Sequence, residues 1–423
     1  MHKRVVITGL GVAAPNGVGL QVFTKAIKEG QSGIRHFEEL EALKFSCQIA
    51  GQPEFEQEFL SRYLNPVQLR GFNSTGLSYG IISGVDAWKD AGLTFNESEP
   101  DWNSGIIFGA GMSSAAKFRE AVYKVDAGNV RRLGSSTVIQ TMASGISAYL
   151  GGILGCGNMI TTNSSACTTG TEAILMGYER IRSGKATRML VGSCSDSGPH
   201  VWGGFDAMRI LPSKYNDNPI AASRPMSASA SGFVPGSGGG ALVLETLESA
   251  QERGATIYAE VLGGAQNSGG QRGSGSITAP NSEAVQRCIK SALQNAVVTP
   301  NQIDTINGHL TATTKDATEI DNWSKALNLS GNDFPYINSL KSMVGHCLAA
   351  SGSIESVASV LQIKEGFIFG NSNCEDLHPE IAQQVSREKI PTTTQEIQPN
   401  IVAKASFGFG DVNACVLFGS YKK

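Results

Sequence analysis

The chain has 423 residues, of which 41% are hydrophobic and only 17% are charged, and it contains 50 glycines. This length allows two domains or one large double domain, and the composition is typical of a soluble enzyme rich in packed interior and tight turns. A formal charge of −3 gives no indication of binding to nucleic acid or to an anionic membrane.

No apolar run reaches the roughly 18 residues of a membrane span. The opening segment 1–9 runs into a strand pattern without the apolar core of a signal peptide. Eight cysteines are scattered along the chain with no C-x-x-C pair, which disfavours a disulfide framework and a zinc finger. We therefore expect reduced thiols and a cytoplasmic location.

Short apolar strands alternate with longer helical patterns along the whole chain, which predicts an α/β architecture. The expected strands are 5–8, 105–109, 189–193, 240–245, 259–263, 305–308, 335–338, 402–406 and 414–418. The expected helices are 22–28, 75–91, 171–182, 283–295, 317–327 and 354–365. Both halves end with a strand pair, but their letters are too dissimilar to establish an internal repeat.

Two further segments constrain the function. Gly9 and Gly11 follow the first strand, but the third glycine of a dinucleotide loop is missing and Pro15 interrupts the expected helix, so they do not predict a nucleotide cofactor. The segment 199–237 is rich in Pro, Ser, Ala and Gly and is expected to be a long irregular excursion. Excursions of that length in a compact domain tend to build sites or interfaces.

Cys167 lies between an expected strand and loop, 157–162, and the helix predicted to follow it. At a helix N-terminus the macrodipole and the unpaired N–H groups favour a thiolate, and the same N–H groups can stabilise an oxyanion beside the sulfur. Taken alone, a cysteine in a run of small residues is more often a buried packing site.

Two histidines follow expected strands in the second half. His309 comes directly after 305–308, where open α/β sheets present functional loops, although a lone histidine there is usually structural. His346 follows 335–338 and is preceded by Lys341, whose charge would keep a neighbouring imidazole neutral near pH 7. The alternative for Lys341 is an ordinary solvated lysine.

The segment 405–414 is a glycine-flanked aromatic turn between two expected strands. Its glycines allow close backbone approach, and Phe409 is a candidate for a mobile lid over an acyl pocket. The alternative is a hairpin with buried phenylalanines.

Taken together, these four residues, a cysteine, two histidines and a lysine, suit a single reaction. A thiolate can accept an acyl group, while two neutral imidazoles donate hydrogen bonds to a thioester carbonyl as a malonyl unit loses its carboxylate. A Cys/His metal site is disfavoured, because Lys341 would repel a cation and no acidic residues stand at ligand spacing.

Nearly end to end, the chain resembles the β-ketoacyl-acyl-carrier-protein synthases of the type I/II elongating class, in the thiolase-like superfamily. The resemblance rests on the segments 5–11, 165–167, 224–225, 232–234, His309 with Thr311 and Thr313, 341–346 and 407–410.

The resemblance implies an α/β thiolase-like fold of two similar five-layered (α-β-α-β-α) halves, expected at 1–250 and 251–423, and a dimer through the central region. It implies a buried site reached by the phosphopantetheine arm of acyl carrier protein, with no cofactor or metal held by the chain itself.

The resemblance also implies a role for each site residue. By position Cys167 is the nucleophile, and His309 and His346 serve decarboxylation and condensation. Lys341 and Glu319 resemble a supporting ion pair. The N–H groups of Cys167 and Phe409 resemble an oxyanion hole, with Phe409 also the gate. The expected substrate-binding residues are Leu310, Thr311, Thr313, Phe407, Gly408, Gly410 and Asp411.

Several residues depart from the family pattern. Leu310 and Asp411 stand where glycine is common in the family, and the loop from His309 to Glu319 is one residue shorter than usual. The segment 227–231, which is usually charged in the family, is rich in Ser and Ala in this chain. These departures favour an unusual acyl chain or partner, as in a specialised polyketide or polyene pathway, over housekeeping fatty-acid elongation. Two competing functions are weaker: a non-catalytic chain-length-factor-like subunit would lack the nucleophile, and a degradative thiolase would lack the 341–346 block.

Overall fold

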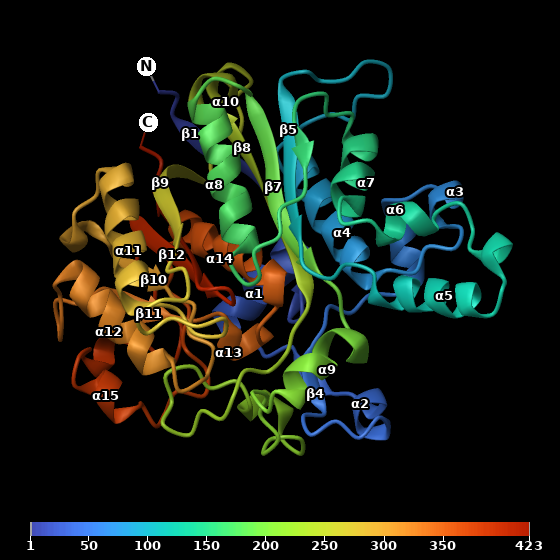
Figure 1. Ribbon diagram of the computed structural model, residues 1–423. Helices are drawn as coiled ribbons and strands as arrows, with labels where there is room; N and C mark the ends of the chain where they lie inside the picture. The colour runs from blue at the N-terminus through green and yellow to red at the C-terminus, as the bar shows by residue number, and fades with distance from the viewer. Residues whose placement is uncertain (1, 423) are drawn as a thin grey trace.

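The chain is described over residues 2–422 in the computed structural model, where two runs of strands and helices follow each other (Figure 1). The first run comprises β1 (Val5–Ala14), β2 (Gly17–Val18), α1 (Leu20–Glu29), β3 (Ile34–His36), α2 (Glu38–Ala42), β4 (Ile49–Gly51), α3 (Pro66–Leu69), α4 (Thr75–Asp90), β5 (Ser104–Ala110), α5 (Ala115–Asp126), α6 (Thr137–Thr141), α7 (Gly145–Leu154), β6 (Ile160–Thr161), α8 (Thr169–Arg182), β7 (Arg188–Ser195), α9 (Pro199–Ala207), β8 (Gly238–Thr246) and α10 (Leu247–Glu252). The second comprises β9 (Ala259–Ser268), α11 (Ser282–Ala296), β10 (Thr305–Asn307), α12 (Asp316–Leu327), β11 (Tyr336–Asn338), α13 (Lys341–Val344), α14 (Ser351–Glu365), α15 (Pro379–Ala382), β12 (Ile401–Gly408) and β13 (Val412–Gly419).

The strand order shows an internal repeat that is not apparent in the amino-acid sequence. In the first run the order is β1-β8-β7-β5-β6, and in the second it is β9-β13-β12-β10-β11, with parallel and antiparallel pairs in matching places. The two sheets join where β1 pairs with β9 over a three-residue register. The two halves therefore share one topology: their strands pair in the same order and directions, although their sequences are dissimilar.

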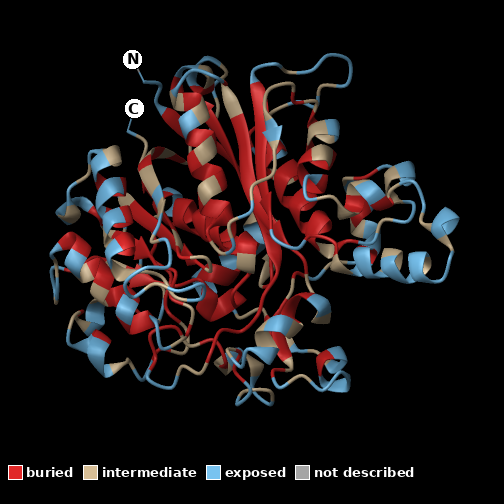
Figure 2. Cartoon of the chain, in the orientation of Figure 1, coloured by how far each residue is buried: buried red, intermediate tan, exposed pale blue. Residues whose placement is uncertain are grey.

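The helices complete five layers, which the two halves form together. Helices α4 and α7 cover the outer face of the first sheet, α11 and α12 cover the outer face of the second, and α8 and α14 lie between the sheets (Figure 1). Burial follows these layers, with the sheets and central helices buried and the outer helices exposed on one side (Figure 2). The α/β architecture is as expected, but the five layers expected within each half belong to the two halves together. None of the helices within residues 2–422 combines the length and apolar content needed to cross a membrane.

The expected strands and helices are confirmed, most of them with longer bounds. Strand β1 continues through Gly9 and Gly11, which lie against α4: a Cβ on these residues would stand 2.2 Å from the Ala87 carbonyl oxygen and 1.9 Å from that of Ser83. The two glycines therefore serve close helix packing and not a nucleotide loop.

The sequence patterns missed several elements of the first half, including α5, α6, α7 and the short β3–β4 hairpin. On α5 only Lys117 is buried, and the apolar residues at helical spacing, Phe118, Val122 and Val125, are exposed to solvent instead of facing the core. The segment 199–237 is not irregular throughout, because it begins with α9, where Pro199 occupies the first turn.

The N-terminal ends of the two central helices meet at a pair of glycines. A Cβ on Gly170 of α8 would lie 2.4 Å from the Ser353 amide nitrogen, and one on Gly352 of α14 would lie 2.5 Å from the Thr171 amide nitrogen. No other residue type allows this contact. It fixes the loops that precede both helices at one place in the middle of the molecule.

We therefore expect Gly170→Ala to lower the free energy of unfolding, by about 1–3 kcal/mol as for other overpacked sites. Gly152→Ala is the control, because a Cβ on this helical glycine meets nothing within 4 Å and the helix gains up to about 1 kcal/mol from alanine. Urea unfolding of both variants measures the difference. Equal stability of the two variants would contradict the close crossing.

Candidate active site

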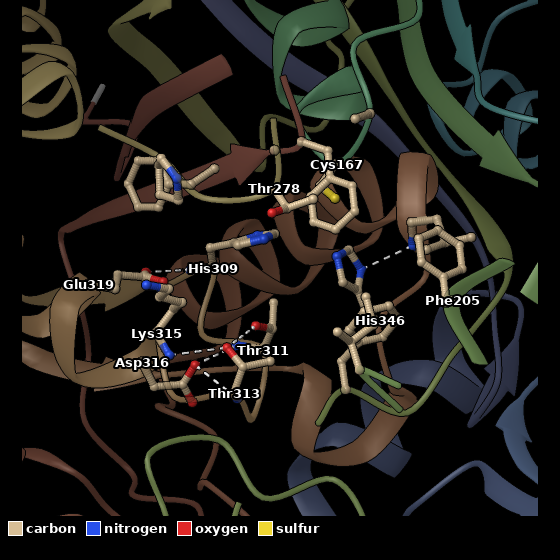
Figure 3. Close-up of a pocket in the computed structure, with 18 of the residues that line it drawn as sticks. Cys167, Phe205, Thr278, His309, Thr311, Thr313, Lys315, Asp316, Glu319 and His346 are labelled. Atoms are coloured by element: carbon tan, nitrogen blue, oxygen red, sulfur yellow. Dashed lines mark hydrogen bonds between the residues drawn. The ribbon is translucent and has the colours of Figure 1, made fainter. Parts of the chain in front are cut away.

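A cavity of about 480 Å³ lies where the loops before α8 and α14 meet, and Cys167, His309 and His346 line it. The cysteine sulfur and one ring nitrogen from each histidine all lie within 4.8 Å of one another. Figure 3 shows the three side chains facing the same space. The tertiary structure thus brings together residues that stand 142 and 37 positions apart in the chain (309 − 167 and 346 − 309).

Cys167 lies in the expected turn between a strand and a helix. The turn leaves β6, places Ala166 at a φ of 49°, and closes with hydrogen bonds from the Thr168 N–H to the Ser165 carbonyl (3.1 Å) and from the Thr169 N–H to the Ala166 carbonyl (3.3 Å). Helix α8 then begins at Thr169. A left-handed residue directly before the cysteine presents the thiol to the cavity at some cost in backbone strain.

Burial raises the pKa of the Cys167 thiol to about 11, although the Lys341 charge and the N–H groups of Phe409 and Cys167 itself act in the opposite direction. Desolvation therefore outweighs the helix N-terminus, and the thiol keeps its proton at neutral pH. The two N–H groups close to the sulfur are those that the sequence proposed for an oxyanion hole. A Cβ on Gly408 would lie 3.1 Å from the Cys167 amide nitrogen, so glycine allows this approach.

The tautomer of His346 follows from its hydrogen bonds. Its Nδ1 accepts from the Leu348 N–H (3.1 Å) and lies 2.9 Å from Ser351 Oγ. A backbone N–H can only donate, so the proton of the neutral ring is on Nε2. The ring nitrogen that remains available to a substrate is therefore a hydrogen-bond donor.

The loop that carries His309 is held by two buried carboxylates. Glu319 accepts from the N–H groups of His309 and Leu310 (both 2.7 Å), and Asp316 accepts from those of Thr311 (2.9 Å) and Ala312 (3.1 Å). Burial raises the pKa of Glu319 to about 7 and that of Asp316 to about 6. The ring of His309 stands edge-on to His346 with the ring centroids 5.3 Å apart.

The expected ion pair between Lys341 and Glu319 is wrong. Lys341 Nζ pairs with Glu355 of α14, and the same carboxylate binds Lys404 Nζ of β12 at 2.8 Å. Glu319 is unavailable because its two oxygens already accept backbone N–H groups. Sequence reasoning missed Glu355, yet a signal existed, since it is the only carboxylate between positions 342 and 363.

Burial first, and then the charges of Lys341 and Lys404, hold the pKa values of both histidines well below their usual range. The rings are therefore neutral at pH 7, as expected. The Cys-His-His cluster is compact enough to hold a metal ion, but the same two ammonium groups oppose a bound cation. The arrangement suits neutral hydrogen-bond donors beside a thiol.

The expected substrate-binding residues divide into two groups. Thr311, Thr313, Phe407, Gly408 and Phe409, the residue expected to act as a gate, line the cavity, whereas Leu310, Gly410 and Asp411 do not. Leu310 packs into the hydrophobic core of the second half, with a φ of 22°. Six apolar residues of the cavity wall were not assigned to the site from the sequence, although the segment 232–234 contains one of them. They come partly from 199–237: Met112, Val201, Phe205, Met208, Ile210 and Phe233.

Asp411 fastens the turn of Phe409 to the loop 269–281. Its carboxylate accepts from the N–H groups of Gln271 (2.9 Å) and Asn281 (2.7 Å), and its carbonyl accepts from the Gly269 N–H (3.0 Å). The loop contributes Ser274, Thr278 and Pro280 to the cavity wall. Asp411 therefore shapes the cavity through the backbone, without touching it.

Comparison with known proteins agrees with this geometry. The family model described as beta-ketoacyl synthase, N-terminal domain, matches residues 2–250, and the corresponding C-terminal domain matches residues 258–375. The chain belongs to the β-ketoacyl synthase family. It is an acyltransferase-type ketosynthase, and the expected thiolase-like fold is confirmed.

Similar curated proteins are 3-oxoacyl-[acyl-carrier-protein] synthases. This ketosynthase is 32% identical to the chloroplastic synthase I of Arabidopsis thaliana (99% of this chain, 87% of the relative) and 33% identical to synthase 1 of Escherichia coli K12 (99% and 100%).

Similar solved structures include a type II polyketide ketosynthase bound to hexaketide and in complex with its acyl-carrier protein (TM-score 0.87, 29% identity, 100% of both chains). They also include the ishigamide ketosynthase/chain length factor (TM-score 0.88, 27% identity, 100% of both chains).

We expect Asp411→Gly to speed backbone amide exchange in 269–281 about tenfold or more, since hydrogen bonds to a charged group contribute about 1.5–3 kcal/mol each. Hydrogen exchange with mass spectrometry measures this. The control is Asn328→Gly, which relieves a similar left-handed φ of 56° at the end of α12. Unchanged exchange in 269–281 would show that Asp411 does not hold the loop.

Proposed function

We propose that this ketosynthase catalyses the decarboxylative Claisen condensation of an acyl group carried on Cys167 with a malonyl group delivered by acyl carrier protein. The observation that carries the proposal is the placement of one thiol and two neutral imidazoles within 4.8 Å at one cavity. No nucleotide, redox group or metal enters this chemistry.

In the first half-reaction the Cys167 sulfur attacks the acyl thioester on the phosphopantetheine arm. A new carbon–sulfur bond forms at Cys167, the bond to the pantetheine sulfur breaks, and the cysteine proton passes to that leaving sulfur. The N–H groups of Cys167 and Phe409 stabilise the oxyanion during the attack, since both already lie close to the sulfur.

In the second half-reaction the imidazoles of His309 and His346 donate hydrogen bonds to the malonyl thioester carbonyl. The malonyl carboxylate leaves as carbon dioxide, and the resulting enolate carbon attacks the acyl carbonyl. The new carbon–carbon bond forms as the bond to the Cys167 sulfur breaks, and the released thiolate takes a proton from water. The Nε2–H of His346 is oriented for this donation by the bond from the Leu348 N–H.

The two ends of the cavity suit the two parts of such a substrate. Thr278, Thr311 and Thr313 line the cavity with hydroxyl groups that fit the amides of a phosphopantetheine arm. Phe205 lies on the other side of His346 (Figure 3) and packs against Phe233 with the ring centroids 5.4 Å apart, and these two rings form an apolar end that fits an acyl chain. We propose that this apolar end sets acyl selectivity. Leu310 has no part in it, because its side chain packs in the core.

We further propose a specialised polyketide or polyene pathway in the cytoplasm as the setting. The similarity to polyketide ketosynthases supports this setting. Housekeeping fatty-acid elongation is the alternative, supported by the curated relatives. A non-catalytic chain-length-factor-like role is disfavoured because Cys167 is present and oriented into the cavity.

We propose that the chain works as a homodimer or pairs with a chain-length-factor-like subunit. Helix α5 projects from the body (Figure 1) and exposes Phe118, Val122 and Val125 on one face. Met112, just before it, lines the cavity while 52% exposed, so a subunit covering α5 would also close that end of the cavity. The Ser227–Ser231 stretch adds no support, since Ser227 and Ser229 bind Asp376 of the same chain.

Replacing each of the three residues tests the chemistry. Cys167→Ala should abolish acyl loading, seen by intact-protein mass spectrometry with a panel of acyl carrier proteins. His309→Ala and His346→Ala should each slow condensation by a factor on the order of 10² or more, because each removes one preorganised donor, while acyl loading survives. Acyl mass on the alanine variant of Cys167, or near-normal turnover of a histidine variant, would refute the assignment.

Light scattering tests the assembly. The purified chain should have the mass of a dimer at micromolar concentration, or form one with a co-expressed subunit, and Phe118→Glu should yield monomers. Val22→Glu, an exposed valine on α1, should leave the mass unchanged. A stable, active monomer would rule out the dimer.

A further inference from the structure

Beneath the Cys-His-His cluster, three charged side chains are buried together: Lys341, Glu355 and Lys404, each with at most 1% of its side chain exposed. Each oxygen of Glu355 faces one ammonium group, Oε1 that of Lys341 and Oε2 that of Lys404 at 2.8 Å. With both lysines protonated, two positive charges share one negative charge. Buried charges are ordinarily paired, so this imbalance calls for a reason.

Burial lowers the pKa of the Lys404 ammonium group, while the Glu355 carboxylate acts in the opposite direction and favours the protonated form. Its Nζ donates to the Ala405 carbonyl and lies 3.1 Å from Ser406 Oγ, in addition to its contact with Glu355. Ser406 Oγ in turn lies 2.9 Å from Thr171 Oγ1. The ammonium group therefore has two hydrogen-bond acceptors, Ala405 and Ser406, and one charge partner, Glu355.

Two further carboxylates lie near the cluster, but they bind backbone and pair with neither lysine. Glu319 and Asp316 accept the N–H groups of the loop that carries His309. The remaining neighbours are thiols and imidazoles, which are neutral when they keep their ordinary protons: Cys167, His309, His346, Cys347 and Cys415.

We propose that Lys404 is a positioning residue which, by occupying one oxygen of Glu355, leaves a net positive charge beneath Cys167 and the two imidazoles. This inference builds on the proposed function. The charge stabilises the Cys167 thiolate that departs when the carbon–carbon bond forms, and it opposes protonation of His309 and His346, which must stay neutral to act as proposed.

The alternative is a purely structural role, in which Lys404 ties β12 to α14 and fills space. The two roles differ in how the reaction responds to pH. Removal of a nearby cation raises the pKa of a thiol and of an imidazole, so both would titrate at higher pH. Loss of a structural tie lowers stability or the overall rate and does not move either titration.

The test uses the full-length protein with Lys404→Met and Lys404→Gln. The pH at which iodoacetamide alkylation of Cys167 reaches half its maximal rate should rise by about half a unit or more in both variants, a shift well within the effect of one nearby charge. The acid limb of malonyl decarboxylation should move to higher pH as well. Lys404→Arg should restore both profiles.

The control is Lys364→Met, which removes an exposed lysine from α14, the helix that carries Glu355. Solvent and salt screen that charge, so neither profile should move. Profiles of Lys404→Gln that match the unsubstituted chain would overturn the proposal. Failure of both neutral variants to fold would also overturn it, because the charge would then serve folding.

The alkylation profile is independent of turnover, which separates this inference from the proposed function. A shifted alkylation profile in a protein that condenses no acyl group would support the role of Lys404 and refute the reaction. Normal condensation with unmoved profiles would support the reaction and refute the role of Lys404.

Discussion

The contact between the N-terminal ends of α8 and α14 is the constraint on which the rest of the structure depends. Gly170 and Gly352 let two buried helices approach closer than any side chain allows, between two sheets of the same topology. Cys167 precedes one helix and His346 precedes the other. The crossing therefore places a nucleophile from one half against an imidazole from the other, and neither half contains the site alone.

Burial sets the chemistry of this site more strongly than any single charge. Desolvation is the largest influence on the pKa values of Cys167, His309 and His346, and it favours the neutral form of each. Lys341 then eases thiolate formation at Cys167, and Lys341 and Lys404 both oppose protonation of the two imidazoles. A thiol flanked by two neutral donors follows from this combination, which suits acyl transfer and enolate stabilisation.

Polar residues that bind the backbone of the surrounding loops decide the shape of the cavity. Glu319 and Asp316 hold the loop of His309, and Asp411 holds the loop 269–281 against the turn of Phe409. Leu310 and Asp411 both adopt positive φ, the backbone conformation that glycine accommodates without strain. The departures from the family pattern thus change how the walls are supported and leave the reacting atoms in place.

By itself the sequence determined the α/β class, most strands and helices, and the identity of Cys167, His309 and His346. These features depend on local periodicity and on residue types at fixed spacing, which the letters contain. Helix α5 was not predicted although Phe118, Val122 and Val125 stand at helical spacing, and only the structure shows that this apolar face is exposed.

Only the tertiary structure decided which distant groups meet. It paired Lys341 with Glu355 rather than Glu319, added Lys404 from a strand whose alternation gives no sign of a buried charge, and turned Leu310 into the core. It also showed the repeat between the halves, because strand order depends on hydrogen-bonded pairing and not on sequence identity. Contacts of this kind are set by the packing of whole helices and sheets, which no local pattern specifies.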